Sequence, residues 1–144
     1  MKQRILLLDD DPAVRRMLRR VLEDEDYLVT CASNGKEAIQ KAAGENVALV
    51  LLDLNLPEEN GWQVLERLTL DHPAMPVIVI TARSNQIFPA LASGVGALME
   101  KPLDLPKLLE IIRSLLDEPA EKRLARIAGR PSEFRYIQPP RNKQ

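Results

Sequence analysis

Acidic residues, a threonine and a lysine stand directly after short apolar runs in this sequence, where they can act together on one ligand. These residues are Asp9, Asp10, Asp53, Thr81 and Lys101. Oxygen ligands without sulfur suit Mg²⁺, which in proteins binds one or two carboxylates together with phosphate oxygens. A lysine supplies positive charge for the same phosphate, and a threonine supplies a hydroxyl donor. Because Asp53 can also accept a phosphoryl group as an acyl phosphate, the pattern predicts phosphoryl chemistry with Mg²⁺.

The apolar runs must be parallel strands for these residues to meet. The run Val47–Leu52 is short and is followed by Asn55 and Pro57, as expected for a strand buried on both faces. Five such runs alternate with helical patterns, which predicts an α/β fold with a five-stranded, doubly wound parallel sheet. Open sheets of this kind bind ligands at the carboxyl ends of their strands. The expected strands are 4–8, 28–32, 47–52, 76–82 and 96–100.

Helix signals lie between these strands. Asp11 followed by Pro12 is typical of a helix N-terminus, and Asp104 is a second expected N-cap. The first helix carries an arginine cluster on one face, to which we assign no function because a solvated face explains it. The cluster comprises Arg15, Arg16, Arg19 and Arg20.

The composition predicts one folded domain. The chain has 144 residues, of which 45% are hydrophobic, and its 20 basic and 21 acidic residues nearly cancel, so net charge favours no particular partner. Cys31 is expected to be a small buried hydrophobe, and the single histidine, His72, has no second histidine with which to share a metal. No apolar run approaches membrane-spanning length and none is typical of a signal peptide, so we expect a cytoplasmic protein without membrane contact.

Residues 117–144 differ from the rest, because they carry seven basic against four acidic residues and are rich in proline. We expect a short helix at about 119–128 and disorder beyond it. The tail is too short for an independent DNA-binding domain without metal or disulfides, so we expect no DNA binding by this chain alone.

Four motifs in order closely resemble the receiver domain of two-component response regulators. They are DDD at 9–11, LDLNLP around Asp53, TA at 81–82 and KP at 101–102. The resemblance covers residues 4 to about 116, so we expect a receiver domain at 1–116. It implies a flavodoxin-like (βα)5 fold with strand order 2-1-3-4-5.

The resemblance also assigns roles within the site. It implies that Asp53 is the phosphoacceptor, that Asp10 binds Mg²⁺ directly and that Asp9 acts through water. Asp53 and the backbone carbonyl of Asn55 complete the expected metal ligands. The expected contacts of the phosphoryl oxygens are Thr81, Lys101 and the amide of Ala82. A cis Lys101-Pro102 bond is implied as well.

A signalling role follows from the resemblance. The phosphoryl donor would be a sensor histidine kinase or a histidine phosphotransfer protein. The chain would be a phosphoacceptor that catalyses only its own phosphorylation and dephosphorylation, not an enzyme with a separate substrate. It would act on a downstream protein that the sequence does not identify. The face formed by the fourth helix, fifth strand and fifth helix is a candidate homodimer surface.

Two other interpretations stay open at this point. A phosphatase resembling haloacid dehalogenases would use Asp9 and Asp11 in its D-x-D motif, but this leaves Asp53 without a role and provides only Asp104 as a further acidic ligand. A receiver-like module that binds partners without phosphorylation commonly lacks an acid, the threonine or the lysine, and here all are present.

The expected conformational switch departs from the family pattern. Receivers commonly pair the threonine with an aromatic residue on the fifth strand, but the position three before Lys101 is Leu98. The fourth helix must be short, because Pro89 fits only its first turn. Thr81 and Leu98 thus stand at the switch positions, but Leu98 has no ring to rotate. We therefore expect phosphorylation to reorder the segment Ser84–Val95 instead, and we expect the partner to bind this face.

Overall fold

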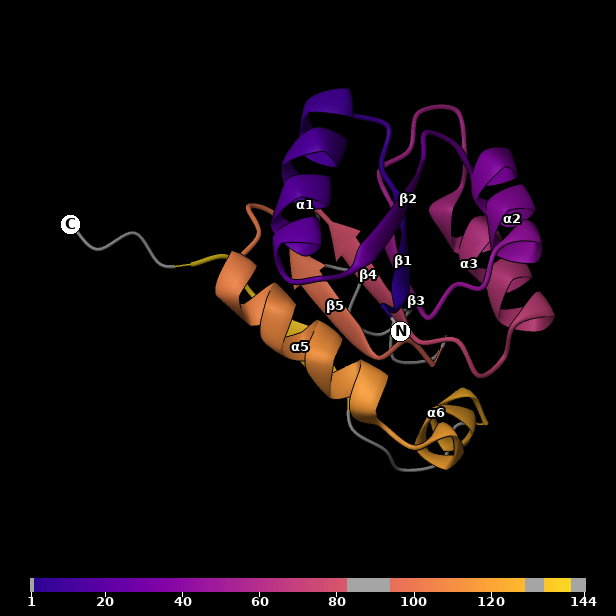
Figure 1. The fold of residues 1–144 in the computed structure, drawn as a ribbon. Coiled ribbons are helices and arrows are strands. Elements are labelled where there is room, and N and C mark those ends of the chain that lie inside the picture. Colours follow the sequence, from indigo (N-terminus) through magenta and orange to yellow (C-terminus); the bar gives the residue numbers. More distant parts are fainter. Residues whose placement is uncertain (1, 83–93, 129–133, 141–144) are drawn as a thin grey trace.

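The computed structural model describes residues 2–82, 94–128 and 134–140, which form a parallel sheet with helices on both faces (Figure 1). The strand order is β2-β1-β3-β4-β5-β6, and every neighbouring pair is parallel. The predicted order 2-1-3-4-5 is confirmed, with a sixth strand added beside β5. The strands are β1 (Arg4–Leu8), β2 (Leu28–Ala32), β3 (Leu49–Asp53), β4 (Val77–Thr81), β5 (Ala97–Glu100) and β6 (Arg135–Ile137).

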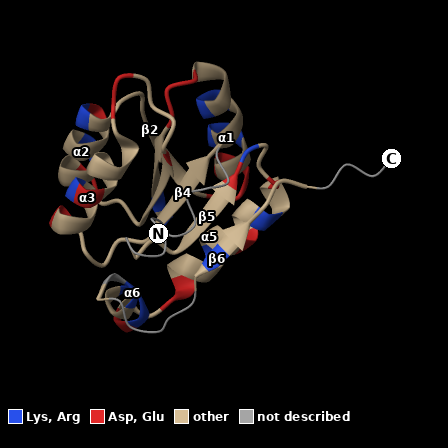
Figure 2. Cartoon of the chain, turned by 180° about the vertical axis from the view of Figure 1, so that it is seen from behind, with Lys and Arg blue, Asp and Glu red and all other residues tan. Residues whose placement is uncertain are grey.

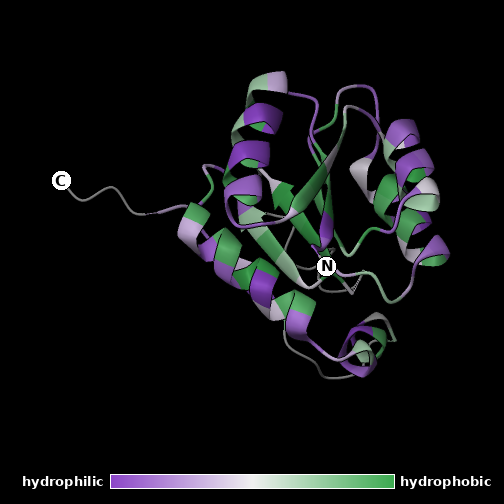
Figure 3. Ribbon diagram, in the orientation of Figure 1, coloured by the Kyte–Doolittle hydropathy of each residue, from purple (hydrophilic) through white to green (hydrophobic). Residues whose placement is uncertain are grey.

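The central strands β1, β3 and β4 supply both core layers. Successive side chains of a strand point to opposite faces, so a strand covered on both sides must be apolar throughout. All five residues of β3 and of β4 are buried. Leu52 packs in the layer beneath α2 and α3, whereas its neighbour Leu51 packs in the layer beneath α1 and α5. Figure 3 shows the resulting apolar centre, with polar residues on the outer helix faces.

The helices begin where capping residues predict. The Asp11 carboxylate accepts a hydrogen bond from the Ala13 amide at 2.9 Å, and Asp104 caps the Lys107 amide at 3.1 Å. Figure 1 places α1 and α5 on one face of the sheet and α2 and α3 on the other. The helices are α1 (Pro12–Asp24), α2 (Gly35–Gly44), α3 (Gly61–Asp71), α5 (Leu105–Asp117) and α6 (Ala120–Ile127).

The tail differs from our expectation. We expected five strands and disorder beyond the tail helix, but Arg135–Ile137 form β6, which pairs with β5. Phe134 and Tyr136 pack against the layer of α2 and α3, and Ile137 packs against the opposite layer. The strand thereby continues both core layers past β5. It escaped detection because a three-residue strand is too short for its alternation to stand out.

Part of the predicted chain lies outside the described residues. The fourth helix expected from Pro89 falls there, as does the proposed switch segment Ser84–Val95, except for Gly94 and Val95. Among the described helices, none combines the length and the apolar character that crossing a bilayer requires.

Candidate functional site

The carboxyl ends of β1, β3, β4 and β5 lie at one edge of the sheet, because the strands run parallel. Asp53 and Thr81 are the last residues of β3 and β4, and Lys101 follows β5 directly. Asp9 and Asp10 follow β1 in the same way. Acidic residues colour the loops after β1 and β3 in Figure 2. The structure therefore brings together the residues that the strand-end pattern singled out.

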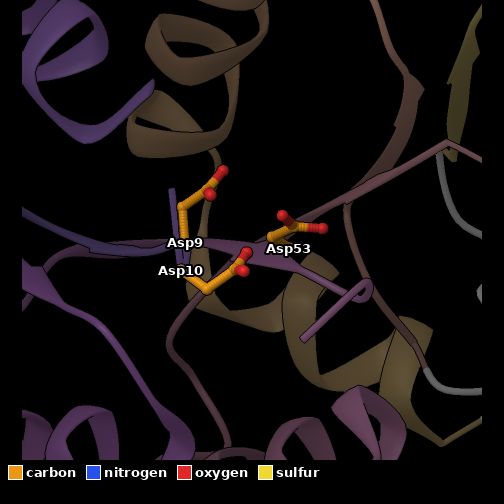
Figure 4. A group of neighbouring side chains, drawn as sticks. All are labelled: Asp9, Asp10 and Asp53. Atoms are coloured by element: carbon orange, nitrogen blue, oxygen red, sulfur yellow. The ribbon is translucent and has the colours of Figure 1, made fainter. Parts of the chain in front are cut away.

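The carboxylates of Asp9, Asp10 and Asp53 face a common space (Figure 4). One oxygen from each lies within 4.8 Å of the others. Asp9 and Asp53 are each only 1% exposed, whereas Asp10 is exposed to solvent. Two buried carboxylates and a third at the entrance concentrate negative charge that the surrounding apolar core does not solvate.

Lys101 supplies the positive charge at this edge. Its Nζ donates a hydrogen bond to Asp53 Oδ2 at 2.9 Å and lies 3.9 Å from Asp9 Oδ2. Burial lowers the pKa of the ammonium, but the hydrogen bond to Asp53 and the nearby acidic charges outweigh burial and hold the pKa above its usual value. Lys101 is therefore protonated across the physiological range. The expected cis Lys101-Pro102 bond is present.

Asp9 is less well compensated than Asp53. Its Oδ1 accepts a hydrogen bond from the Asp11 amide at 2.9 Å, but its Oδ2 is buried and has no hydrogen-bond partner among residues 2–82, 94–128 and 134–140. Burial raises the pKa of the Asp9 carboxyl; the Asp11 amide opposes this effect, and the charge of Asp53 adds to it. A buried carboxylate oxygen without a hydrogen-bond donor is expected to bind a further positively charged group.

This donor set fits a hard divalent cation. Carboxylate oxygens gather without sulfur or imidazole, and the buried Oδ2 of Asp9 lacks a donor. Mg²⁺ favours such oxygen ligands and retains water in its remaining positions. Asp9, Asp10, Asp53 and the Asn55 carbonyl, which we expected as the ligand set, are the residues that would hold it.

Asn55 makes two contacts that orient the site. Its backbone amide donates to Asp53 Oδ1 at 2.8 Å, and its side-chain Oδ1 accepts a hydrogen bond from the Ala82 amide at 2.8 Å. The Ala82 amide, which we expected to contact a phosphoryl oxygen, is thus held by Asn55 in this structure. Sequence reasoning named only the Asn55 carbonyl, because no motif signals a contact between two loops.

Thr81 is fully buried at the end of β4. Together with Asn55 and Trp62 it lines a pocket of about 430 Å³, whose walls include Leu54, the residue after Asp53. Because Trp62 shares this pocket with Asn55 and Thr81, its indole is the spectroscopic probe we choose for the site. Leu98, in contrast, is fully buried within the layer of α2 and α3, and its role in a switch stays a prediction.

Arg15 was also missed. Its Nη1 donates to the backbone carbonyl of Asp9 at 2.6 Å, so it fixes the start of the acidic loop. Arg16, Arg19 and Arg20 remain exposed, as expected for a solvated helix face. Arg15 lies in the first turn of the helix that follows the acidic end of β1, and this position distinguishes it from Arg16, Arg19 and Arg20 in the sequence.

Comparisons with known proteins agree with this geometry. The family model of the response regulator receiver domain matches residues 5–113. The transcriptional regulatory protein SrrA of Staphylococcus aureus is 36% identical over 118 residues, which are 81% of this chain and 48% of SrrA, so the chain spans about half the length of this curated relative.

Solved structures give the same result. A CheY-like response regulator receiver domain protein from Methanospirillum hungatei JF-1 aligns with a TM-score of 0.78 and 35% identity, over 85% of this chain and 98% of that one. The response regulator TrrA from Thermotoga maritima, solved in complex with Mg(2+)-BeF, aligns with a TM-score of 0.73 and 29% identity, over 78% of this chain and 98% of TrrA. With the family model, the relative and the strand-end acids in agreement, this chain belongs to the response regulator receiver domain family of two-component systems.

Proposed function

We propose that this chain accepts a phosphoryl group on Asp53 from a phosphohistidine and that phosphorylation alters its binding to a downstream protein. The observation that carries the proposal is the pairing of the buried Asp53 carboxylate with the Lys101 ammonium at 2.9 Å. One Asp53 oxygen accepts from the Asn55 amide and the other from Lys101, so the carboxylate is held in one orientation. Fixed orientation and a facing cation are what phosphoryl transfer requires of a protein.

The transfer exchanges one bond to phosphorus for another. A carboxylate oxygen of Asp53 bonds to phosphorus, the bond between phosphorus and the donor's histidine nitrogen breaks, and the leaving imidazole takes up a free proton from solution. In the reset step a water oxygen bonds to phosphorus and the bond to the Asp53 oxygen breaks. The products are the free carboxylate, inorganic phosphate and a proton, so the phosphoryl group is both substrate and signal.

Lys101, Thr81 and Ala82 are the residues we assign to the phosphoryl oxygens. The ammonium of Lys101 neutralises charge that builds on these oxygens during transfer. The Thr81 hydroxyl and the Ala82 amide are donors at the end of β4, which pairs with the β5 strand that Lys101 follows. For Ala82 to act in this way, its amide must exchange the Asn55 side chain for a phosphoryl oxygen.

Mg²⁺ is the cofactor we propose, held by Asp9, Asp10, Asp53 and the Asn55 carbonyl. When bound, the ion supplies positive charge that offsets the repulsion between these carboxylates and the phosphoryl oxygens. The unpartnered Oδ2 of Asp9 supports this assignment. The complex of the related TrrA with Mg(2+)-BeF supports it as well.

The phosphatase alternative fits the geometry less well. It requires Asp9 and Asp11 to act together, but the Asp11 carboxylate caps α1 by accepting from the Ala13 amide. Asp53, which that interpretation leaves idle, is the carboxylate that Lys101 contacts. The alternative of a receiver-like module without phosphorylation has no observation in its favour, because every acid, the threonine and the lysine are in place.

The proposed cellular role follows from this chemistry. The donor is a sensor histidine kinase or a histidine phosphotransfer protein, and the output is a protein contact made in the cytoplasm. We assign the receiver to residues 1–116 and treat 117–144 as a separate tail. A homodimer through the face of the fourth helix, β5 and α5 stays a proposal, and β6 occupies the β5 edge of that face.

Mass spectrometry after incubation with acetyl phosphate and Mg²⁺ tests the phosphoacceptor. We expect a single phosphoryl adduct that is stable in acid and labile in base, and we expect Asp53→Asn to abolish it. Asp24→Asn, at an exposed position of α1, is the matched control and should label at the normal rate. Labelling of Asp53→Asn at the wild-type rate would disprove the assignment.

A further inference from the structure

The C-terminal tail is docked on the domain by arginine contacts at the end of α5. Arg123 Nη2 donates to the backbone carbonyls of Leu115 and Glu118, at 3.1 and 2.8 Å. These carbonyls belong to the last turn of α5 and its C-cap, where helical hydrogen bonding ends; the Leu115 carbonyl also accepts from the Glu118 amide at 3.3 Å. Arg123 Nη1 reaches the Ala74 carbonyl at 3.1 Å, before β4. Helix α6 is thereby attached to α5 and to the loop that precedes β4.

Beyond α6 the tail adds β6 to the sheet edge. The amide of Arg135 donates to the Gly96 carbonyl at 3.3 Å, and the Arg135 guanidinium contacts Glu110 of α5 at 3.2 Å. Tyr136 lies opposite Leu98 in the register of the two strands. The Tyr136 hydroxyl donates a hydrogen bond to the carboxylate of Glu100, and both residues are half-buried.

The contact between Tyr136 and Glu100 lies next to the candidate site. Glu100 is the last residue of β5, and the residue bonded to it is Lys101. Without β6, the four-residue β5 would be an edge strand paired only with β4, and its final residues would be held on one side alone. On the β4 side, the Lys101 amide donates to the Thr81 carbonyl at 2.9 Å. With β6 in place, the Glu100 side chain holds the end of β5 on its other side as well.

We infer that the C-terminal tail positions Lys101 for phosphoryl transfer, with Tyr136 acting on Lys101 through Glu100. Tyr136 is a positioning residue in this arrangement, because it touches neither Asp53 nor the proposed phosphoryl oxygens. The inference rests on the proposed function of Asp53 and adds a regulatory element to it. Displacing the tail, for example by a partner that binds β6 or α6, would loosen Lys101 and slow phosphorylation.

Thermodynamic linkage gives the same inference in the other direction. If docking of the tail favours the placement of Lys101 that a phosphoryl group needs, then a phosphoryl group must favour docking of the tail to the same extent. A short strand with few contacts opens readily, so its opening equilibrium responds measurably to such coupling. Beryllofluoride with Mg²⁺ is the probe we choose for the phosphoryl group.

The test removes one oxygen atom and uses the full chain. Tyr136→Phe retains the ring and deletes the hydroxyl that contacts Glu100, and Tyr27→Phe makes the same change at a half-buried tyrosine before β2. We expect Tyr136→Phe to label with acetyl phosphate about fivefold more slowly than wild type, the effect of losing one ordinary hydrogen bond. Tyr27→Phe should label normally. Glu100→Gln, which retains an acceptor oxygen, should keep most of the rate.

Hydrogen exchange measures the positioning without any phosphoryl chemistry. The Lys101 amide should exchange faster in Tyr136→Phe than in Tyr27→Phe, while the two variants melt within a few degrees of each other. In wild type, Mg²⁺ with beryllofluoride should slow exchange of the Tyr136 and Ile137 amides.

The outcomes separate this inference from the proposed function. If wild type labels on Asp53 and Tyr136→Phe labels equally fast, the inference is wrong and the phosphoacceptor assignment stands. If wild type does not label at all, the phosphoacceptor assignment is wrong, and exchange of the Lys101 amide still decides whether Tyr136 positions this lysine. Unchanged exchange there would overturn the inference, as would a rate loss that Tyr27→Phe reproduces.

Discussion

At the carboxyl edge of the sheet Asp9 and Asp53 share a single ammonium, whereas at the amino edge Glu118 is enclosed by guanidinium groups. Arg126 Nη1 donates to Glu118 Oε2 at 3.0 Å, a second Arg126 nitrogen donates to Oε1, and Arg123 Nε lies 3.9 Å from Oε1. The side chains of Glu118 and Arg126 are 7% and 4% exposed, so this ion pair is buried, as is the Asp53 carboxylate of the site. Figure 1 shows α6, which carries Arg126, at the end of the sheet away from the loop after β1.

The difference between the two edges separates a structural charge from a functional one. At Glu118 both carboxylate oxygens accept hydrogen bonds from a planar guanidinium, which matches carboxylate geometry and leaves no acceptor for a ligand. At Asp9 one oxygen lies buried without a donor among the described residues, and the neighbouring Asp53 repels it. A protein tolerates such an arrangement where a ligand completes it, since uncompensated charge lowers stability.

The largest expected change in stability comes from removing the ion pair between Arg126 and Glu118. Arg126→Met removes the guanidinium and leaves the Glu118 carboxylate buried, which typically destabilises by about 3 kcal/mol. The loss is limited by the docking free energy of α6, because an undocked helix returns Glu118 to water. We therefore expect fast hydrogen exchange throughout α6 and a lower midpoint of urea unfolding.

Arg16→Met is the matched control for this experiment, because Arg16 is exposed on α1. It should change the unfolding free energy by no more than about 0.5 kcal/mol, as is usual for surface substitutions. Protection of α6 that survives Arg126→Met would mean that the pair does not hold the tail, and the contrast between the two edges would fail.

The second-largest expected effect is a gain in stability, whereas Arg126→Met causes a loss. Asp9→Asn should stabilise the Mg²⁺-free protein at neutral pH by about 1 kcal/mol, because it removes a charge that burial and Asp53 disfavour. The pKa of Asp9 is raised above its ordinary value of 3.8, so the folded state holds this proton more tightly than the unfolded state does. Stability from this group is therefore full below 3.8 and is lost as pH rises through the folded pKa.

Urea unfolding of wild type and Asp9→Asn at several pH values measures this difference. The variant's advantage should be absent at the acid end and should grow as pH rises. Added Mg²⁺ should stabilise wild type more than the variant, which narrows the gap. A variant that is less stable than wild type at neutral pH without Mg²⁺ would contradict the interpretation that Lys101 alone does not compensate the charge of Asp9.

The fold was predictable because burial on both faces leaves a clear trace in the sequence. The runs that became β1, β3 and β4 are uninterrupted and end at polar residues, and Asp11 and Asp104 marked helix starts that the structure contains. Strand β6 left no comparable trace, because its stability comes from pairing with β5 and not from its own three residues.

The site was predictable only to the extent that topology determines it. Asp9, Asp53 and Lys101 meet because parallel strands end at one edge, which holds for any loop conformation. The contact of Arg15 with the Asp9 carbonyl depends on the course of one loop, and so does that of Asn55 with the Ala82 amide. Neither residue stands at a strand end, so strand-end reasoning had no means of finding these contacts.

An exposed ion pair tests whether burial or ion pairing determines how much a charge substitution changes the unfolding free energy. Glu37 in the first turn of α2 lies 2.9 Å from Lys41 Nζ, and both side chains are more than a third exposed. The hydrogen bond from Lys41 lowers the pKa of Glu37 below its ordinary value of 4.5, more than burial raises it. Its contribution is therefore present above 4.5 and is lost as pH falls through the folded pKa.

Glu37→Gln should lower the unfolding free energy by only about 0.5 kcal/mol at neutral pH, because water and salt screen exposed pairs. The effect should shrink in 1 M NaCl and disappear in acid, where the wild-type carboxylate is protonated. Glu66→Gln, at an exposed position of α3, should change stability less. If Glu37→Gln lowered the unfolding free energy as much as Arg126→Met, the formation of an ion pair alone would determine the size of the loss. A loss several fold smaller means that burial determines how strongly a charge affects stability. This would hold for the paired charge of Glu118 and for the incompletely compensated charge of Asp9.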